Sequence, residues 1–281
     1  MELMKDYKHD TALRASFEAL AHETFGLNLE PWYRAGFWDN TYVPYSLAEN
    51  GRVVANVSAN TVYLTVDGRP VNAIMLGTVM THKDHRGKGY AARLMNAVLD
   101  EYHASADLIY LFANEQALDF YPKFGFVPRE EQQCFVNLKG VTPKPEPYNK
   151  LNIRKTDDLT LVRRLISTGF SARKRLNAAD NGALILFYCL SGLENGLRYY
   201  PGSDTLLFYD NGVLLDFFSG GGLTLAEAAA LLADGQSELP LGFTPEEDSS
   251  DYLWRRYDDH LFTLGGEKLT GNFMFPTLSR A

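Results

Sequence analysis

The hydrophobic and polar positions in the first half of the chain change period several times. Apolar residues three and four apart predict a helix from Asp10, a capping residue, to about Thr24. Alternating runs then predict strands, and the Asn-Gly and Asp-Gly pairs between them suit hairpin turns. These strands are expected at Tyr42–Leu47, Arg52–Ser58, Thr61–Val66 and Val71–Thr81.

A second helical pattern follows a charged loop and runs from Ala91 to Tyr102. The wholly apolar run Leu108–Phe112 is typical of an interior parallel strand. A short helix near Asn114–Phe124 and a last strand near Gln133–Leu138 complete this half. This order of elements predicts an α/β fold with a mixed sheet.

A proline-rich segment interrupts the pattern. Three prolines and one glycine between Lys139 and Pro147 are incompatible with a helix or an interior strand, so they predict a stiff linker. We therefore expect one domain over residues 1–139, a linker over 140–149 and a second domain over 150–281. The length of 281 residues suits two domains.

Composition narrows the classes of protein. The chain is 46% hydrophobic and 22% charged, as globular proteins are. A net charge of −8 argues against a nucleic-acid-binding surface and favours a small cationic partner. The sequence has neither a run of ~18 apolar residues nor a secretory leader, so we expect no membrane contact. Cys134 and Cys189 are expected to be free thiols in a reducing compartment, which favours the cytoplasm.

The loop between the strand that ends at Thr81 and the helix after Ala91 has the composition of an anion site. Gly87 and Gly89 would let the backbone approach a phosphate, and the amides of a helix N-terminus attract negative charge. Positive charge comes from three neighbouring side chains, those of His85, Arg86 and Lys88. A plain surface loop with a tight turn is the alternative.

Two segments resemble the signatures of the GNAT superfamily of N-acetyltransferases. Arg86-Gly-Lys-Gly-Tyr-Ala91 is similar to the R/Q-x-x-G-x-G/A motif, and the segment from Asn114 to Phe126 resembles the second signature. The third glycine of a dinucleotide-binding G-x-G-x-x-G motif is missing. The resemblance implies a twisted mixed sheet whose central parallel strands separate to hold acetyl-CoA as the acetyl donor.

The same resemblance implies roles for individual residues. The backbone of Val79 and Thr81 would contact the pantetheine arm, and the amide of Val79 would hold the oxyanion. Asn114 would line the other side of the cofactor. Tyr121 would protonate the departing thiolate, although a buried core tyrosine is the alternative. The pyrophosphate would lie against the backbone amides of Arg86, Gly87, Lys88, Gly89, Tyr90 and Ala91.

The general base is left open. Several members of the superfamily carry a glutamate on the fourth strand, but Ala73–Thr81 contains no acidic residue. In the enhanced-intracellular-survival type of acetyltransferase, which the chain resembles loosely, the C-terminus reaches the active site, so the carboxylate of Ala281 is a candidate. A docked C-terminal strand is the favoured interpretation of that tail. The other candidates, directly or through water, are Glu23, Glu30, Asp39, Glu115 and His82.

Four aromatic residues follow the first predicted helix: Trp32, Tyr33, Phe37 and Trp38. They could stack on an acceptor or hold a cation, but burial of a second helix is the favoured interpretation. His82 and His85 lack a third ligand nearby, so no metal site is expected.

The second half repeats the outline of the first. A strand and a helix near Leu151 are followed by three strands, a helix at Thr224–Leu232 and a strand at Leu239–Phe243. The loop Ser219–Gly222 is glycine-rich but lacks the cations of a pyrophosphate site. We expect a degenerate GNAT-like domain that shapes the acceptor site. The three strands are expected at Leu197–Tyr200, Thr205–Tyr209 and Val213–Phe218.

These observations predict an acetyl-CoA-dependent N-acetyltransferase that acts directly on the primary amine of a small molecule, with an acidic acceptor cleft as a secondary expectation. The alternative is a catalytically silent acyl-CoA sensor with the second domain as its output. The glycine loop supports both equally, whereas Tyr121 supports the enzyme. The acceptor and the oligomeric state are not specified by the sequence.

Overall fold

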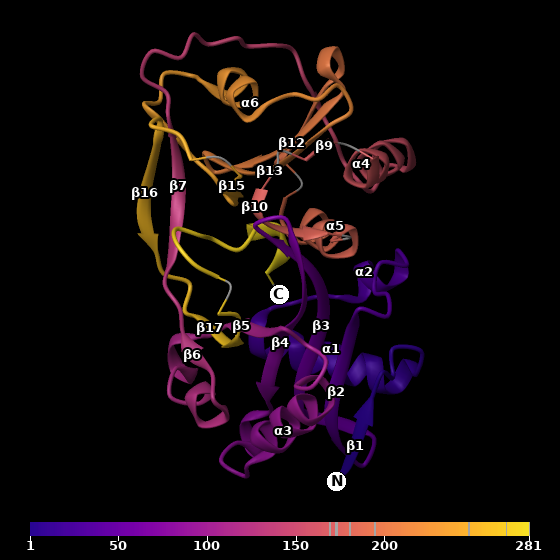
Figure 1. The fold of residues 1–281 in the computed structure, drawn as a ribbon. Coiled ribbons are helices and arrows are strands. Elements are labelled where there is room, and N and C mark those ends of the chain that lie inside the picture. Colours follow the sequence, from indigo (N-terminus) through magenta and orange to yellow (C-terminus); the bar gives the residue numbers. More distant parts are fainter. Residues whose placement is uncertain are drawn as a thin grey trace.

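The structure is a computed structural model that describes residues 1–168, 170–171, 174–179, 181–193, 195–246, 248–267 and 269–280. In Figure 1 the first half, in indigo and purple, lies below the second half, in orange and yellow. The yellow C-terminal segment returns to the middle of the molecule, between the two halves (Figure 1). No described helix is long and apolar enough to cross a bilayer.

A nine-stranded mixed sheet forms the centre of the first half. Its main path runs in the order β1-β2-β3-β4-β5-β17-β6, and only the β4–β5 pair on this path is parallel. The strands on this path are β1 (Glu2–Lys5), β2 (Tyr42–Glu49), β3 (Arg52–Val66), β4 (Arg69–Thr81), β5 (Leu108–Phe112), β17 (Leu261–Gly265) and β6 (Val127–Pro128). The strands β10 (Lys174–Ala179) and β15 (Thr244–Pro245) extend it from the outer end of β3.

Helices cover both faces of this sheet. The helix α1 (Thr11–Phe25) begins as predicted, because the Asp10 carboxylate accepts hydrogen bonds from the amides of Ala12 and Leu13. Its apolar side shares a core with the short helix α2 (Glu30–Arg34) and with the second half. The helix α3 (Tyr90–Tyr102) packs against the opposite face.

Most predicted elements of the first half form, with four differences. The polar strand β1 was not expected, because its side chains are mostly exposed and carry little hydrophobic pattern. The two strands expected between Arg52 and Val66 are one continuous strand, β3. The short helix expected near Asn114 is two 3₁₀ turns, η2 (Glu115–Ala117) and η3 (Tyr121–Phe124).

The fourth difference concerns the strand expected at Gln133–Leu138. It forms as β7 (Glu131–Asn137), but it pairs with β14 (Glu238–Pro240) and β16 (Tyr252–Tyr257) in a separate sheet. The place beside β5 is taken by β17, more than a hundred positions further along the chain. Leu261 and Phe262 of β17 are buried, so this apolar strand suits an interior position as well as β7 does.

The second half contains a five-stranded antiparallel sheet in the order β8-β11-β12-β13-β9. Its three central strands match the prediction, whereas the strand expected from Leu151 is only the pair Asn149–Lys150. The strands are β8 (Asn149–Lys150), β11 (Leu197–Tyr200), β12 (Thr205–Asp210), β13 (Val213–Ser219) and β9 (Phe170–Ser171), and the helices are α4 (Thr156–Thr168), α5 (Gly182–Ser191) and α6 (Leu225–Leu232).

Strands from both sides of the proline-rich segment thus share one sheet, although the domain boundary at residues 140–149 stays a prediction. The core around α1 also contains residues of α4 and α5, so the halves pack through a common apolar core. Cys134 and Cys189 are free and buried, as expected.

Candidate functional site

The two parallel strands at the centre of the sheet separate towards their carboxyl ends. Pairing between β4 and β5 begins at Ala73 and Leu108 and ends at Met75 and Tyr110. The strand β4 nevertheless continues to Thr81. The last residues of β4 therefore face a gap on the β5 side, where backbone groups are available to a ligand.

A bulge in β4 lies at this gap. The register with β3 shifts between the pairs Asn56–Met80 and Ser58–Gly77, and Thr78 has a φ of 43°. A positive φ is strained for a β-branched residue, and such strain persists only where the surroundings hold it.

Buried side chains hold the bulge. The Asn56 amide donates to the carbonyl oxygen of Thr78 at 2.9 Å, and the Thr78 hydroxyl donates to Ser58 Oγ at 2.7 Å. Because the Thr78 proton is used in this way, the Tyr42 hydroxyl is the donor in its 2.8 Å bond with Thr78 Oγ1. The network fixes the residues that border the gap.

A cavity of about 270 Å³ occupies the gap, and we call it the strand-gap cavity. It brings together three residues that the sequence analysis selected, Val79, Asn114 and Tyr121, from β4, the end of β5 and η3. The other lining residues are Phe25, Leu27, Leu76, Gly77, Thr78 and Phe112. Apolar walls with a phenol and an amide suit a thioester arm.

Tyr121 is buried within an aromatic cluster. Its ring lies 5.3 Å from that of Phe120, 6.2 Å from that of Phe126 and 5.7 Å from that of Phe262 on β17. Burial raises the pKa of the Tyr121 phenol to about 12. The hydroxyl therefore keeps its proton at neutral pH and is available as a donor.

The glycine loop lies between the end of β4 and the N-terminus of α3. Gly87 and Gly89 have φ values of 73° and 75°, and Gly89 is the residue that precedes α3. A Cβ at either glycine would meet no protein atom within 4 Å. Glycine is therefore favoured at both positions by the positive φ and not by a lack of room for a side chain. Tyr90 and Ala91 begin the helix, whose first amides are open to an anion.

Arg86 and Lys88 of this loop are exposed, whereas His85 is partly buried. Arg86 Nε donates to the carbonyl oxygen of Thr81 at 3.2 Å, which ties the loop to the end of β4. Within the described residues no carboxylate pairs with Arg86 or Lys88. His85 differs, because its Nε2 lies 3.2 Å from Glu49 Oε2. Arg86 and Lys88 therefore remain available to a phosphate.

Residues 10–129 match the family model described as the acetyltransferase (GNAT) domain. This segment is a GNAT acetyltransferase domain. The match ends before β7, so it covers the strand-gap cavity and the glycine loop but none of the second half. A search of curated proteins found no significant match.

Solved structures extend the likeness to the whole chain. They include a probable N-acyltransferase of unknown function from Enterococcus faecalis V583, a GCN5-related N-acetyltransferase from Kribbella flavida and Eis1 from Mycobacterium abscessus. The identities are 12%, 13% and 13%, and the TM-scores are 0.55, 0.54 and 0.55. Each alignment covers 93% of this chain, and 72%, 71% and 73% of the respective structures.

At this identity the likeness shows the fold alone. The predicted fold class, a GNAT fold with a mixed sheet followed by a second GNAT-like α/β unit, is confirmed.

The candidate bases of the GNAT domain lie apart from the strand-gap cavity. Glu23 lies 3.6 Å from His82 Nε2 and 3.7 Å from Lys83 Nζ, beside the glycine loop. Glu30 pairs with Arg14 and Arg34, and Glu115 is exposed on η2. None of these carboxylates lines the strand-gap cavity. Ala281 lies outside the described residues.

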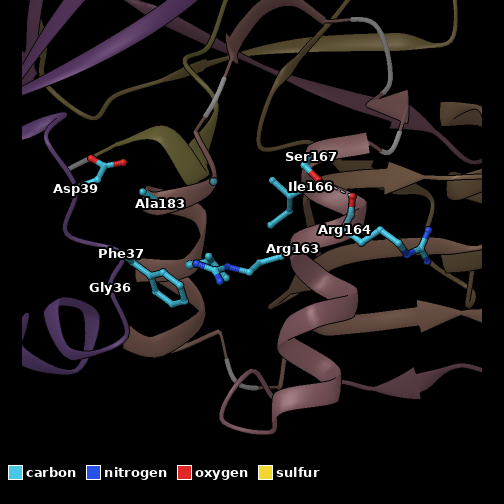
Figure 2. Close-up of a pocket in the computed structure, with 10 residues that line it drawn as sticks. Gly36, Phe37, Asp39, Arg163, Arg164, Ile166, Ser167 and Ala183 are labelled. Atoms are coloured by element: carbon cyan, nitrogen blue, oxygen red, sulfur yellow. Dashed lines mark hydrogen bonds between the residues drawn. The ribbon is translucent and has the colours of Figure 1, made fainter.

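Phe37 and Asp39 line a different cavity, of about 400 Å³, between the loop after α2 and the helices α4 and α5. Figure 2 shows Phe37 and Arg163 extending towards each other, while Arg164 points away. The Arg163 guanidinium lies 4.7 Å from the centre of the Phe37 ring, and Arg164 pairs with Asp204 at 2.6 Å. The Phe37–Arg163 contact joins the two halves, whereas the Arg164–Asp204 pair lies within the second half. Asp39 lines this cavity and not the strand-gap cavity.

A third cavity adjoins the strand-gap cavity, and we call it the apolar cavity. It has a volume of about 350 Å³ and shares Leu27, Thr78 and Phe112 with its neighbour. The sequence analysis selected only Trp32 among its residues and missed α5, whose apolar run is compatible with a strand or a helix. The other lining residues are Leu29, Tyr42, Leu184, Phe187, Tyr188 and Arg280.

The remaining aromatic candidates are divided between core and surface. Trp38 is buried and donates to the carbonyl oxygen of Tyr42, while Tyr33 stacks under the Arg14 guanidinium at 3.8 Å. His82 and His85 have ring centres 5.7 Å apart. Within the described chain no group of three or more His, Cys, Asp or Glu residues has the arrangement of a metal site.

The glycine loop of the second half differs from that of the GNAT domain. It borders a cavity with Asp204 and Glu227, which are both acidic. A Cβ on Gly221 would lie 2.6 Å from the carbonyl oxygen of Ser203, so here glycine is required by close packing against the backbone. The Glu227 side chain accepts from the amide of Thr224 and closes the capping box at the start of α6. Acidic side chains disfavour a pyrophosphate at this position.

Proposed function

We propose that the chain is an acetyl-CoA-dependent N-acetyltransferase that transfers the acetyl group directly to the primary amine of a small molecule. The observation that carries this proposal is the gap between β4 and β5, which gathers Val79, Asn114 and Tyr121 in one cavity. The glycine loop and the open N-terminus of α3 follow directly after the end of β4.

The residues fit the two ends of the donor. The pyrophosphate would lie on the amides of Arg86 to Ala91, with Arg86 and Lys88 as cationic partners. The pantetheine arm would extend along the backbone of Val79 and Thr81, and Asn114 would line its other side. The edge of β4 beyond Met75 supports this placement, because among the described residues it does not pair with β5 there.

The transfer needs a hydrogen-bond donor to the oxyanion and a group that stabilises the departing thiolate. The amine nitrogen forms a bond with the thioester carbon, the carbonyl oxygen becomes an oxyanion held by the Val79 amide, and the carbon–sulfur bond then breaks. The sulfur leaves with the bonding electron pair, and the nitrogen loses one proton to water as the amide forms.

Tyr121 assists by a hydrogen bond to the sulfur. Burial raises the pKa of the Tyr121 phenol to about 12, so the phenol keeps its proton and acts as a hydrogen-bond donor. A donated hydrogen bond stabilises the developing thiolate. The thiolate then takes its proton from water.

The test is release of free thiol from acetyl-CoA. Purified full-length protein is mixed with acetyl-CoA and a panel of primary amines, and the N-acetyl product is identified by mass spectrometry. Thiol release that depends on the amine supports the enzyme. If acetyl-CoA raises the melting temperature but no amine releases thiol, the proposal fails and the silent acyl-CoA sensor is the better description.

A further inference from the structure

We propose that the apolar cavity selects a primary amine carried on a compact, uncharged, apolar body, such as a short n-alkylamine or an arylalkylamine, over polyamines and amino sugars. This inference rests on the proposed acetyltransferase function and names its acceptor class. The acidic acceptor cleft expected from the net charge does not form at this cavity, because its described lining contains no carboxylate.

The apolar cavity is positioned to hold the acceptor. It shares Leu27, Thr78 and Phe112 with the strand-gap cavity, so a molecule within it borders the end of the thioester channel. Its volume of about 350 Å³ is at the small end of ligand pockets, which suits a single compact body. The second half closes it through Phe187 and Tyr188 of α5.

Two donors of the lining are already engaged. Trp32 Nε1 donates to the carbonyl oxygen of Ala183 at 2.8 Å, and the Tyr188 hydroxyl donates to the carbonyl oxygen of Arg280 at 2.6 Å. Arg280 Nε is a buried donor without a partner among the described residues, and a donor cannot serve a second ammonium. A body with several hydroxyls would lose its water with too few new partners here. The lining therefore disfavours polyhydroxylated and polycationic acceptors.

Arg280, the charged residue of the lining, is paired with two carboxylates that do not line the cavity. Its guanidinium forms ion pairs with Glu131 at 2.9 Å and with Asp259, and it stacks 4.4 Å from the centre of the Phe112 ring. Among the described residues, neither carboxylate lines the cavity, so a second cation within it would meet the Arg280 guanidinium before either of them.

One oxygen remains to receive the reacting nitrogen. The Tyr42 hydroxyl donates to Thr78 Oγ1, and a hydrogen bond from Ser58 would use one of its two lone pairs, so a second lone pair is left to accept from an amine N–H. Burial raises the pKa of Tyr42 to about 12, so this oxygen stays neutral. Tyr42 is thus a positioning residue at the boundary that Thr78 shares with both cavities.

An apolar cavity also favours the reactive form of the amine. Burial disfavours the ammonium and lowers the pKa of the bound amine. The acceptor is therefore bound as the neutral amine, and its ammonium proton is lost to water as it leaves the bulk solvent. This reduces the need for the carboxylate that β4 lacks.

The test uses a homologous series with the full-length protein and saturating acetyl-CoA. From n-propylamine to n-pentylamine, kcat/KM is expected to rise about 4-fold for each methylene group, which corresponds to ~0.8 kcal/mol of burial. Butane-1,4-diamine has the same number of non-hydrogen atoms as n-pentylamine but ends in an ammonium. We expect its kcat/KM to be at least 100-fold lower.

A variant provides an independent readout. Phe187→Asp places a carboxylate in the cavity wall and is expected to raise the ratio of diamine to n-pentylamine kcat/KM at least 10-fold. Leu253→Asp makes a similar change on the exposed surface of β16 and should leave the ratio unchanged. If Phe187→Asp fails to fold, the comparison of the alkylamines with the diamine in the wild-type protein still tests the acceptor class.

The outcomes separate this inference from the function on which it rests. A flat alkylamine series, or a preference for the diamine or for kanamycin, overturns the apolar acceptor class while the acetyltransferase stands. Absence of thiol release with every amine overturns both. A rising series with rejection of the diamine supports both.

Discussion

The ring of Tyr121 packs against the ring of Phe262, with centroids 5.7 Å apart. Tyr121 belongs to the GNAT domain, whereas Phe262 lies on β17 near the other end of the chain. The tyrosine that borders the strand gap is thus oriented by a strand that the GNAT domain does not encode.

Tyr121→Phe should lower kcat by about 10²-fold, because it removes the hydrogen-bond donor that stabilises the negative charge developing on the sulfur. The KM for acetyl-CoA and the melting temperature should change little, since the ring contacts remain. The matched control is Tyr110→Phe on β5, whose hydroxyl is buried without a hydrogen-bond partner among the described residues. That variant should keep full activity. An unchanged kcat in Tyr121→Phe would remove Tyr121 from the mechanism.

The pH profile gives a second check on Tyr121. Burial raises its pKa to about 12, so the phenol stays protonated from pH 7 to pH 10. Activity should therefore show no loss from Tyr121 over this interval and should rise as the free amine becomes neutral. Steady-state kinetics across the interval measure this. A decline that begins below pH 10 in wild type but not in Tyr121→Phe would contradict the assignment.

Gly89→Ala should raise the KM for acetyl-CoA at least several-fold. A left-handed backbone costs a non-glycine residue about 1–2 kcal/mol, and relief of that strain would move the amides at the start of α3. Gly68→Ala is the control, because Gly68 has a similar φ of 73° in the β3–β4 turn and equally open space around it. Both variants should lose similar stability in urea denaturation. Equal KM changes in the two would argue against a phosphate site at Gly89.

A chain cut after residue 139 should fail to fold cooperatively. It retains the predicted GNAT domain but loses β17, which pairs with β5 from Leu108 to Phe112. Loss of β17 would expose the edge of β5 and the face of Phe126, which is buried in the same cluster as Phe262. Circular dichroism and thermal melting of the fragment measure this. A sharp melt and acetyl-CoA binding by the fragment would show that residues 1–139 are an independent domain.

Tyr42→Phe should lower kcat/KM for the amine about 5- to 10-fold, the effect of about one hydrogen bond, and leave the KM for acetyl-CoA unchanged. Thr78 keeps its contacts with Asn56 and Ser58, so the bulge should persist. A parallel rise in the KM for acetyl-CoA would indicate a structural role at the bulge instead.

Glu18→Gln should stabilise the protein at pH 8 but not at pH 5. Glu18 Oε2 accepts from the amide of Leu29 at 3.0 Å, while Oε1 is buried without a partner among the described residues. Burial raises the pKa of Glu18 from 4.5 to about 7. The folded state therefore binds this proton more tightly than the unfolded chain does, and stability falls as the pH rises between these values.

The expected gain at pH 8 is about 1 kcal/mol, because Glu18 is only partly buried and solvent screens its charge. Urea denaturation of wild type and variant at both pH values measures it, and the glutamine retains an oxygen to accept from Leu29. The same difference at pH 5 and pH 8 would mean that the charge of Glu18 is not the cause.

The sequence by itself determined the local elements of the GNAT domain. Asp10 begins α1 and the Asn-Gly and Asp-Gly pairs form the turns, because caps and positive-φ turns are set by neighbouring residues. The glycine loop and Tyr121 were selected in the same way, since the motif is contiguous. These features depend on contacts within a few positions of the chain.

Only the tertiary structure decided which strand lies beside β5 and what forms the acceptor side. The strands β7 and β17 have similar patterns, and an apolar pattern specifies burial but not the partner strand. Tyr42, Phe187 and Arg280 meet in one cavity from distant parts of the chain. Such long-range contacts depend on how complete surfaces pack together, so the residues of the proposed donor site could be selected from the sequence, while the proposed acceptor cavity required the fold.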